Sequence, residues 1–245
     1  MRLTKIDPEI AQARLQGRIF DDFIYYTSTE TWTSLAADAN ATVADSDAHL
    51  GVLVINTGDV VNNNEAGVRT TQEILLFAAD QPFYIEGLIQ YTEVNTDGAA
   101  VAFGVADNMA AADFMADGGT ASPAVANSGV VIYKRNDETV WRAYCENNGV
   151  SFDTQSVQTA GGADYHVLGI GGRAIDGTNF EFTYFMDGLP LTDSNNRPIV
   201  HTLAFASATE MEFGVYCKSA GGGASLTVNV DYLGLVAGRA RSPFA

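Results

Sequence analysis

The sequence predicts an all-β sandwich, and three observations support this prediction. Period-two alternation of apolar and polar residues begins near Arg18 and recurs in short segments as far as Val236. These segments are rich in Val, Ile, Phe, Tyr and Thr, which favour strands. Turn-forming clusters such as Asn95–Gly98 and Glu146–Gly149 separate them. About ten short strands with almost no helix favour two sheets packed face to face.

The expected strands follow one another along most of the chain. They are Ile19–Tyr26, His49–Asn56, Thr71–Phe77, Phe83–Thr92, Ala99–Ala106, Gly129–Arg135, Thr139–Glu146, Tyr165–Gly171, Phe180–Met186, Met211–Lys218 and Ser225–Val236. We interpret Gly221–Gly223, between the last two strands, as a hairpin loop. A short helix is expected at Pro8–Gln16, and a helical turn or two within the Ala-rich stretch Asp107–Asp117.

Length and composition fit one folded domain with a short extension at each end. The 245 residues are 47% apolar and 18% charged, which is ample for a buried core. No segment approaches the roughly 18 apolar residues of a membrane-spanning helix, and residues 1–20 lack the apolar stretch of a secretory signal. We therefore expect an N-terminal arm over residues 1–18, a sandwich over 19–237 and a C-terminal tail over 238–245.

Charge is distributed unevenly along the chain. The net charge is −17, yet residues 1–18 and residues 238–245 each carry +2. An acidic body argues against nucleic acid and anionic membranes as partners, because both bind through basic residues. Two interpretations of the basic ends stay open. They are frayed termini of a soluble body, or arms that dock on an acidic neighbour.

Hydrolysis of a glycosidic bond needs two carboxylates about 5–10 Å apart, and the sequence offers weak candidates. The strand Phe83–Gln90 carries Glu86 alone. Glu210 and Glu212 could share a strand face, and Glu73 could join neighbours in the same way. We favour a solvated strand face for the Glu210/Glu212 pair. The sequence also lacks a nucleophile elbow and a phosphate-binding loop, so we expect no catalytic residue and no enzyme.

Metal and cofactor sites are not expected either. His49, His166 and His201 show no metal-ligand spacing. Residues 59–65 and 193–196 contain clustered Asp, Asn and Glu that could bind calcium. Asx turns are the favoured interpretation of both stretches, because neither holds a complete Asp-x-Asp-x-Asp-Gly loop.

We interpret the two cysteines as core residues. Several aromatic residues are also interpreted as core residues, with sugar stacking as the alternative. Alternation places Cys145 and Cys217 on apolar strand faces, where free thiols are favoured and a disulfide requires neighbouring strands. Tyr144 shares a polar face with Arg142 and Glu146, so it is the aromatic residue most open to a ligand. The other candidate platforms for sugar stacking are Trp32, Trp141, Tyr25, Tyr26, Tyr91 and Tyr133.

Four segments resemble concanavalin A-like jelly rolls in their order along the chain. They are Phe83–Gln90, Val101–Val105, Phe182–Gly188 and Leu226–Leu233. The Asp-Gly pair that ends the third segment resembles the hairpin of these folds, and the fourth resembles their closing strand. Together with residues 57–65, 71–77 and 78–82, they resemble a group of tailed-phage structural proteins of jelly-roll type. The resemblance covers residues 19–237.

This resemblance implies a jelly-roll β-sandwich and a function on the virion. Related proteins are capsid decoration (cement) proteins, often homotrimers, that bind the major capsid protein on the outer surface of HK97-type shells. The chain would then be made in the host cytoplasm and reside on the capsid surface. The docking residues would be Arg2, Lys5, Ile6, Ile10, Arg14, Leu15, Arg18, Arg239 and Arg241. The alternative is a carbohydrate-binding module of a phage tail or fibre, with a surface glycan as its partner.

Overall fold

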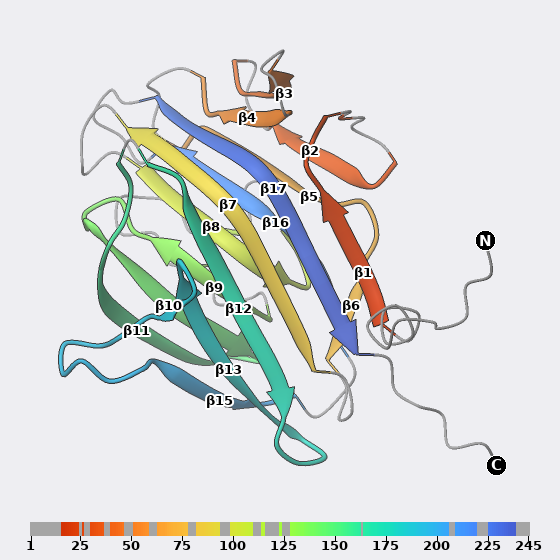
Figure 1. Ribbon diagram of the computed structural model, residues 1–245, viewed down its shortest axis with the longest axis vertical. Coiled ribbons are helices and arrows are strands. Elements are labelled where there is room, and N and C mark those ends of the chain that lie inside the picture. Colours follow the sequence, from red (N-terminus) through yellow and green to blue (C-terminus); the bar gives the residue numbers. More distant parts are fainter. Residues whose placement is uncertain are drawn as a thin grey trace, which may run out of the picture.

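The computed structural model consists of two β-sheets packed face to face (Figure 1). It describes residues 16–24, 26, 30–36, 40–46, 51–58, 63–77, 82–93, 99–109, 114–115, 123, 128–162, 164–205, 209–219 and 225–238. Within these residues every regular element is a strand, and the strands pair antiparallel. The prediction of an all-β sandwich is therefore confirmed.

The sheet nearer the viewer in Figure 1 is called the front sheet. Its nine strands are β1 (Gln16–Asp21), β3 (Thr42–Ser46), β4 (Val52–Asn56), β7 (Phe83–Glu93), β12 (His166–Ala174), β13 (Asn179–Met186), β14 (Leu189–Pro190), β15 (Val200–Ala204) and β17 (Leu226–Gly238). They follow the order β14-β13-β12-β7-β17-β4-β3, with β1 on β17 and β15 on β13. The central strand β7 thus lies between β12 and β17.

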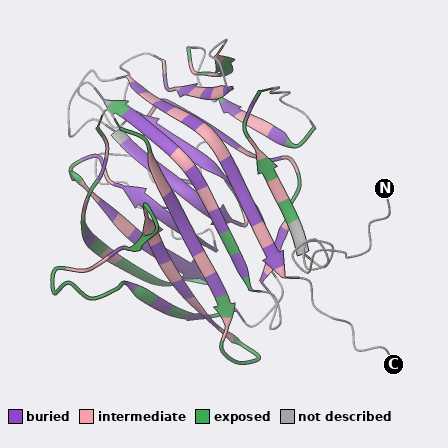
Figure 2. Cartoon of the chain, in the orientation of Figure 1, coloured by how far each residue is buried: buried purple, intermediate pink, exposed green. Residues whose placement is uncertain are grey.

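The second sheet, the back sheet, closes the core from the other side. Its eight strands are β2 (Trp32–Ala36), β5 (Glu65–Thr70), β6 (Leu75–Phe77), β8 (Ala99–Ala106), β9 (Gly129–Lys134), β10 (Val140–Asn147), β11 (Val150–Thr159) and β16 (Thr209–Ser219). They follow the order β11-β10-β9-β8-β16-β5-β2, with β6 on β16. Strand alternation sends apolar side chains between the sheets, and Figure 2 shows the resulting bands of buried residues along the strands.

Both cysteines lie in this core, as their strand pattern predicts. Cys145 of β10 and Cys217 of β16 are buried and free. Their inward neighbours belong to the same apolar cluster and include Trp141, Ala143, Met211, Phe213 and Val215. Strands β9 and β8 separate β10 from β16, and the register places Cys145 level with Phe213, four residues from Cys217. By strand geometry the two cysteines therefore lie roughly 20 Å apart. A disulfide between them is therefore excluded.

Several predicted elements differ from the observed ones. Seventeen strands are found in the described residues, and β2, β3, β5, β11, β14 and β15 were not expected. β11 is an edge strand whose side chains are mostly exposed, so its sequence has no apolar face to reveal it. The hairpin around Gly221–Gly223 is wrong because β16 and β17 lie in different sheets. β1 ends before Phe23, whose backbone N–H donates to Asp21 Oδ1 in a turn with positive φ.

Neither predicted helix is found in the described residues. Pro8–Gln16 lies outside them, apart from Gln16, which begins β1. Within Asp107–Asp117, residues 107–109 form a bend and coil, and Met115 bridges Pro123. The remainder of that stretch lies outside the described residues. The described part of the chain also holds no helix with the length and hydropathy of a membrane span.

The outer face of the back sheet is covered by its own chain. Met109, Phe114 and Met115 form a second apolar cluster with residues of β8, β9, β10 and β16. The ring of Phe114 meets that of Tyr216 edge-on at 5.4 Å. Tyr144, predicted to be open to a ligand, is 4% exposed, and its hydroxyl donates to Glu146 at 2.6 Å. The prediction for Tyr144 is wrong because the covering segment comes from a distant part of the sequence.

A buried ion pair fastens this cover to the sheet. Lys218 Nζ lies 2.5 Å from Glu65 Oε1 and donates to the backbone oxygen of Met115 at 3.0 Å. The Lys218 and Glu65 side chains are 1% and 3% exposed. Removing one member of such a pair leaves a charge buried without its main counter-ion.

We therefore expect Lys218→Met to destabilise the fold by about 3–5 kcal/mol. Urea unfolding measures this change. The double variant Lys218→Met with Glu65→Leu removes both charges and should recover most of the loss. Equal losses in the single and the double variant would contradict the role given to the ion pair.

A second buried polar group makes stability depend on pH. His201 of β15 is 6% exposed, with Nδ1 3.0 Å from the Tyr184 hydroxyl and Nε2 2.9 Å from Thr154 Oγ1. Burial lowers the pKa of His201 from 6.5 to about 4. Between these two values the unfolded chain binds the extra proton and the folded chain does not. The contribution of His201 to the free energy of unfolding is therefore fully present above pH 6.5. It is lost as the pH falls from 6.5 toward 4.

The loss should amount to about 3 kcal/mol. Urea unfolding between pH 7 and pH 4.5 should show it in the natural chain and not in His201→Gln. His166→Gln, which changes a partly exposed histidine at the start of β12, serves as the matched control and should keep the loss assigned to His201. An unchanged slope in His201→Gln would show that other groups cause it.

Candidate functional site

The outer face of the front sheet carries a row of side chains that crosses five strands. Cross-strand register places in one row, from β13 to β1, Phe185, Gly169, Glu86, Gly234 and Phe20. The residues on either side of Glu86 in β7, Ile85 and Gly87, point into the core. The row therefore faces outward, and its four strand gaps give it a length of about 19 Å.

A second row runs beside the first, two residues further along each strand. It contains, in the same strand order, Thr183, Gly171, Tyr84, Val236 and Arg18. The ten residues of the two rows are called the trough. Glycine occupies three of these positions, so the backbone forms much of the floor. Glu86 stands between two of the glycines, Gly169 and Gly234.

Gly169 gives the trough its shape because it makes room for Tyr84. A Cβ atom at Gly169 would lie 2.6 Å from the Tyr84 hydroxyl oxygen, which shows that this side chain lies across β12. The Tyr84 ring then meets the Phe185 ring edge-on, with centroids 6.2 Å apart. This is the first of two aromatic pairs on the outer face of the front sheet, which is called the open face.

The second aromatic pair lies on the other side of Glu86. Phe20 is 67% exposed, and its ring stacks on that of Tyr232 at a centroid distance of 5.4 Å. The Tyr232 hydroxyl donates to Glu86 Oε1 at 3.4 Å. A carboxylate flanked by aromatic pairs on both sides is the central feature of this face.

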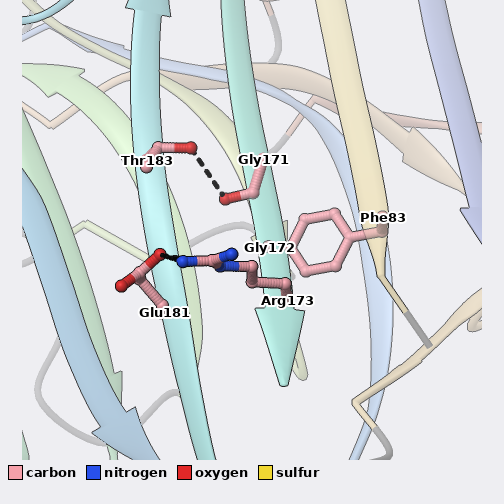
Figure 3. Close-up of a pocket in the computed structure, with 6 residues that line it drawn as sticks. All are labelled: Phe83, Gly171, Gly172, Arg173, Glu181 and Thr183. Atoms are coloured by element: carbon pink, nitrogen blue, oxygen red, sulfur yellow. Dashed lines mark hydrogen bonds and ion pairs between the residues drawn. The ribbon is translucent and has the colours of Figure 1, made fainter. Parts of the chain in front are cut away.

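Two pockets lie on opposite sides of Tyr84. The first has a volume of about 380 Å³ and is lined by the residues drawn in Figure 3, namely Phe83, Gly171, Gly172, Arg173, Glu181 and Thr183. The second has a volume of about 210 Å³ and is lined by Arg18, Ile19, Phe20, Tyr84, Glu86, Gly234, Leu235 and Val236. Tyr84 lines the second pocket and pairs across the strands with Gly171, which lines the first, so it stands between the two compartments.

Charges within this surface are balanced. Arg173 Nε donates to Glu181 Oε1 at 2.8 Å, as Figure 3 shows, and Arg18 and Glu86 line the other pocket together. Burial and the Glu86 charge raise the pKa of Tyr84, and the same causes raise the pKa of Tyr232 to about 12. Both phenols are therefore protonated at neutral pH and can donate hydrogen bonds.

The trough does not hold the carboxylate pair of a glycosidase. Within its two rows Glu86 is the one carboxylate. Glu181 lies two strands and four residues away, a backbone separation of roughly 16 Å by strand geometry. Glycosidases need about 5–10 Å. The arrangement can accept and donate hydrogen bonds and can stack on apolar rings, which suits binding rather than hydrolysis.

The other candidate acids are engaged elsewhere. Glu212, on the outer face of the back sheet, pairs with Arg69 and accepts a hydrogen bond from the Met109 backbone N–H at 2.9 Å. It is 9% exposed, so the prediction of a solvated face is wrong for Glu212. A hydrogen bond with Glu210 raises the pKa of Glu73.

The described residues of the two candidate calcium-binding segments form a turn and an ion pair within the protein. Asp193 Oδ1 accepts hydrogen bonds from the backbone N–H groups of Asn195 and Arg197, which confirms the Asx turn. The bond from Arg197 is the main cause that lowers the pKa of Asp193. Glu65 binds Lys218, and residues 59–62 lie outside the described part. Among the described residues, no group of three or more His, Cys, Asp or Glu is placed to hold a metal ion.

The predicted docking residues cannot be placed, with one exception. Arg18 is described and exposed on β1, where it lines the smaller pocket. The others lie outside the described residues and are Arg2, Lys5, Ile6, Ile10, Arg14, Leu15, Arg239 and Arg241. Capsid docking through them stays a prediction.

Sequence reasoning missed the aromatic residues of the open face. Five of its candidate sugar platforms are buried, namely Trp32, Trp141, Tyr91, Tyr133 and Tyr144. Tyr26 is half-buried and Tyr25 lies outside the described residues. Tyr84 could have been found, because it shares the polar phase of its strand with Glu86. Phe20 carries no comparable signal.

Comparisons with known proteins identify the class of fold. No family model and no curated protein sequence matches the chain. The carbohydrate recognition domain of Emp47p has a TM-score of 0.55 and 11% identity, covering 91% of this chain and 95% of its own. Lectin I from Ulex europaeus, solved with the methyl glycoside of α-L-fucose, has a TM-score of 0.55 and 10% identity, covering 91% and 98%. An endo-1,3-β-glucanase from Streptomyces sioyaensis has a TM-score of 0.54 and 11% identity, covering 91% and 96%.

These likenesses show the fold alone, because the identities are low. The chain has the fold of a concanavalin A-like jelly-roll sandwich, as its strand motifs predicted. The comparisons contain both lectins and glycan-degrading enzymes, and they do not bear on a phage capsid.

The position of Tyr84 over Gly169 can be tested directly. In Gly169→Ala the new methyl group should displace the Tyr84 ring, while the free energy of unfolding changes by less than about 1 kcal/mol because a side-chain end can move. Nuclear Overhauser cross-peaks between the Tyr84 and Phe185 rings should disappear. Gly177→Ala, at a glycine with open space around it, is the control. Persistent cross-peaks in Gly169→Ala would contradict the geometry.

Proposed function

We propose that this protein is a carbohydrate-binding module and that the trough is its binding surface. The observation that carries the proposal is the pair of aromatic contacts on either side of Glu86. Phe20 with Tyr232 and Tyr84 with Phe185 present ring surfaces to solvent on a floor made largely of glycine backbone. Exposed aromatic residues gathered on one face mark a binding site more often than scattered ones do.

The chemistry of a sugar ring fits this surface. A pyranose has an apolar face of C–H groups and a rim of hydroxyls. The aromatic rings can stack against the apolar face, while the Glu86 carboxylate accepts hydrogen bonds from hydroxyls. The Arg18 guanidinium and the Thr183 hydroxyl line the two pockets and can bind the remaining oxygens.

The comparisons support this class of ligand. Proteins of the same fold include a carbohydrate recognition domain and a lectin solved with a fucoside. A glucanase also shares the fold, and its activity is a reason to consider hydrolysis here. We propose binding without cleavage, because Glu86 has no carboxylate partner at glycosidase distance in the trough.

The resemblance to tailed-phage structural proteins supports a place for this module on a virion. A tail or fibre position would suit glycan binding at a cell surface. Decoration of a capsid is the second candidate, and the basic segments at residues 1–18 and 238–245 support it. Quantitative mass spectrometry of purified particles separates the two. Hundreds of copies per particle would indicate decoration, and a few to some tens would indicate a tail or fibre.

Phe20→Ala and Tyr84→Ala should each weaken glycan binding about tenfold, because each removes one stacking surface worth roughly 1.4 kcal/mol. A glycan array identifies a ligand for the natural chain, and titration calorimetry measures the variants. Phe152→Ala is the matched control, since Phe152 is 43% exposed but lies on β11 of the back sheet. Equal affinities in all three variants would contradict the proposed surface.

A further inference from the structure

We infer that the ligand is an uncharged polysaccharide chain, bound through internal units that cross the strands over Tyr84 with one sugar ring in each pocket. This inference rests on the proposed function. It narrows the ligand from any glycan to one that is uncharged and several sugar units long. Three features support it: the division of the trough, its open ends and its charge balance.

The division of the trough indicates at least two sugar subsites. Tyr84 lines the smaller pocket, and the floor of the larger pocket, Gly171, pairs with Tyr84 across the strands. The volumes are about 380 and 210 Å³. Pockets for drug-sized ligands span about 300–1,000 Å³. The larger compartment lies near the lower end of this range and the smaller one below it, so each suits a small part of a chain, such as one ring, rather than an oligosaccharide. A ligand that fills both must bridge Tyr84.

The trough continues to exposed residues at both ends. On the β1 side it ends at Phe20, which is 67% exposed. On the β13 side, Thr183 pairs with Val200 and Phe185 with Pro190, and both of these partners are exposed. A site for a terminal sugar needs a wall that stops the chain. This surface has none at the described ends of its two rows, so a polymer can pass across it.

The charges favour an uncharged chain. Arg18 and Glu86 share one pocket, and Arg173 and Glu181 pair in the other, so the described residues lining the pockets carry no net charge. The whole chain carries −17. A polyanion such as a uronic acid polymer would therefore be repelled at long range and would find no unbalanced positive charge in the trough.

The test measures affinity against chain length. The probes are oligosaccharides of one to six units from β-1,3-glucan, β-1,4-glucan, xylan and mannan, with oligogalacturonate as the anionic series. Calorimetry with the full chain should show at least a tenfold gain from one unit to four units in one uncharged series. The gain should level off once both pockets are filled.

A pocket-filling variant links this gain to the trough. Gly171→Leu should fill the floor of the larger pocket, because a Cβ there meets only side-chain atoms, the nearest being Thr183 Oγ1 at 3.1 Å. It should abolish most of the gain with chain length and leave binding of the single sugar intact. Gly177→Leu, at an exposed turn, is the matched control and should behave as the natural chain. Circular dichroism confirms that each variant is folded.

The outcomes separate this inference from the proposed function. Equal affinity for one unit and for four units would overturn the chain inference and leave carbohydrate binding standing. Strongest binding to oligogalacturonate would overturn the charge class alone. A full gain retained in Gly171→Leu would place the chain elsewhere on the molecule. Failure to bind any glycan of a broad array would overturn the proposed function and the inference together.

Discussion

The trough depends on a single irregularity in β17. Before the bulge between Val230 and Tyr232, the residues that enter the core are Leu226, Val228 and Val230. After it they are Leu233, Leu235 and Ala237. The inward phase thus moves from even to odd positions, which turns Tyr232 and Gly234 outward beside Glu86. A regular strand would have sent Tyr232 into the core and a leucine onto the open face, because side chains alternate strictly along a strand.

The two sheets use their outer faces differently. The back sheet is covered by Met109, Phe114 and Met115, and the buried pair of Lys218 with Glu65 holds this cover in place. In the front sheet the described residues leave the trough open, with aromatic rings at its two sides. Among the described residues, the back sheet thus has a second layer of packing on its outer face, whereas the trough on the front sheet has none. Fold and site are separable, since the trough residues add little to the core.

The alternation of apolar and polar residues predicts correctly which side chains of many strands enter the core. It places Cys145 and Cys217 in the core, because each lies in phase with large apolar neighbours. It fails for Tyr144, since that ring is buried by residues about thirty positions earlier in the chain and no periodicity reports such a contact. The bulge in β17 could have been predicted from the sequence. Two adjacent residues, Asp231 and Tyr232, interrupt the alternation, and the apolar positions before and after them differ in phase. The pairing of β1 with β17, which brings Phe20 beside Tyr232, could not be predicted from the sequence. Local alternation does not indicate which distant strand becomes a neighbour.

The isolation of Glu86 decides what kind of chemistry the trough supports. Its row neighbours are glycines, so its carboxylate is reached from solvent and is not paired with a second acid. An acid–base mechanism needs two carboxyl groups whose environments separate their pKa values, and one carboxylate cannot supply both roles. The Tyr232 hydroxyl donates to Glu86 and so helps to orient its carboxylate. Glycine on either side of Glu86 and aromatic rings beyond them make a surface suited to stacking and hydrogen bonding, which is the chemistry of the proposed glycan binding.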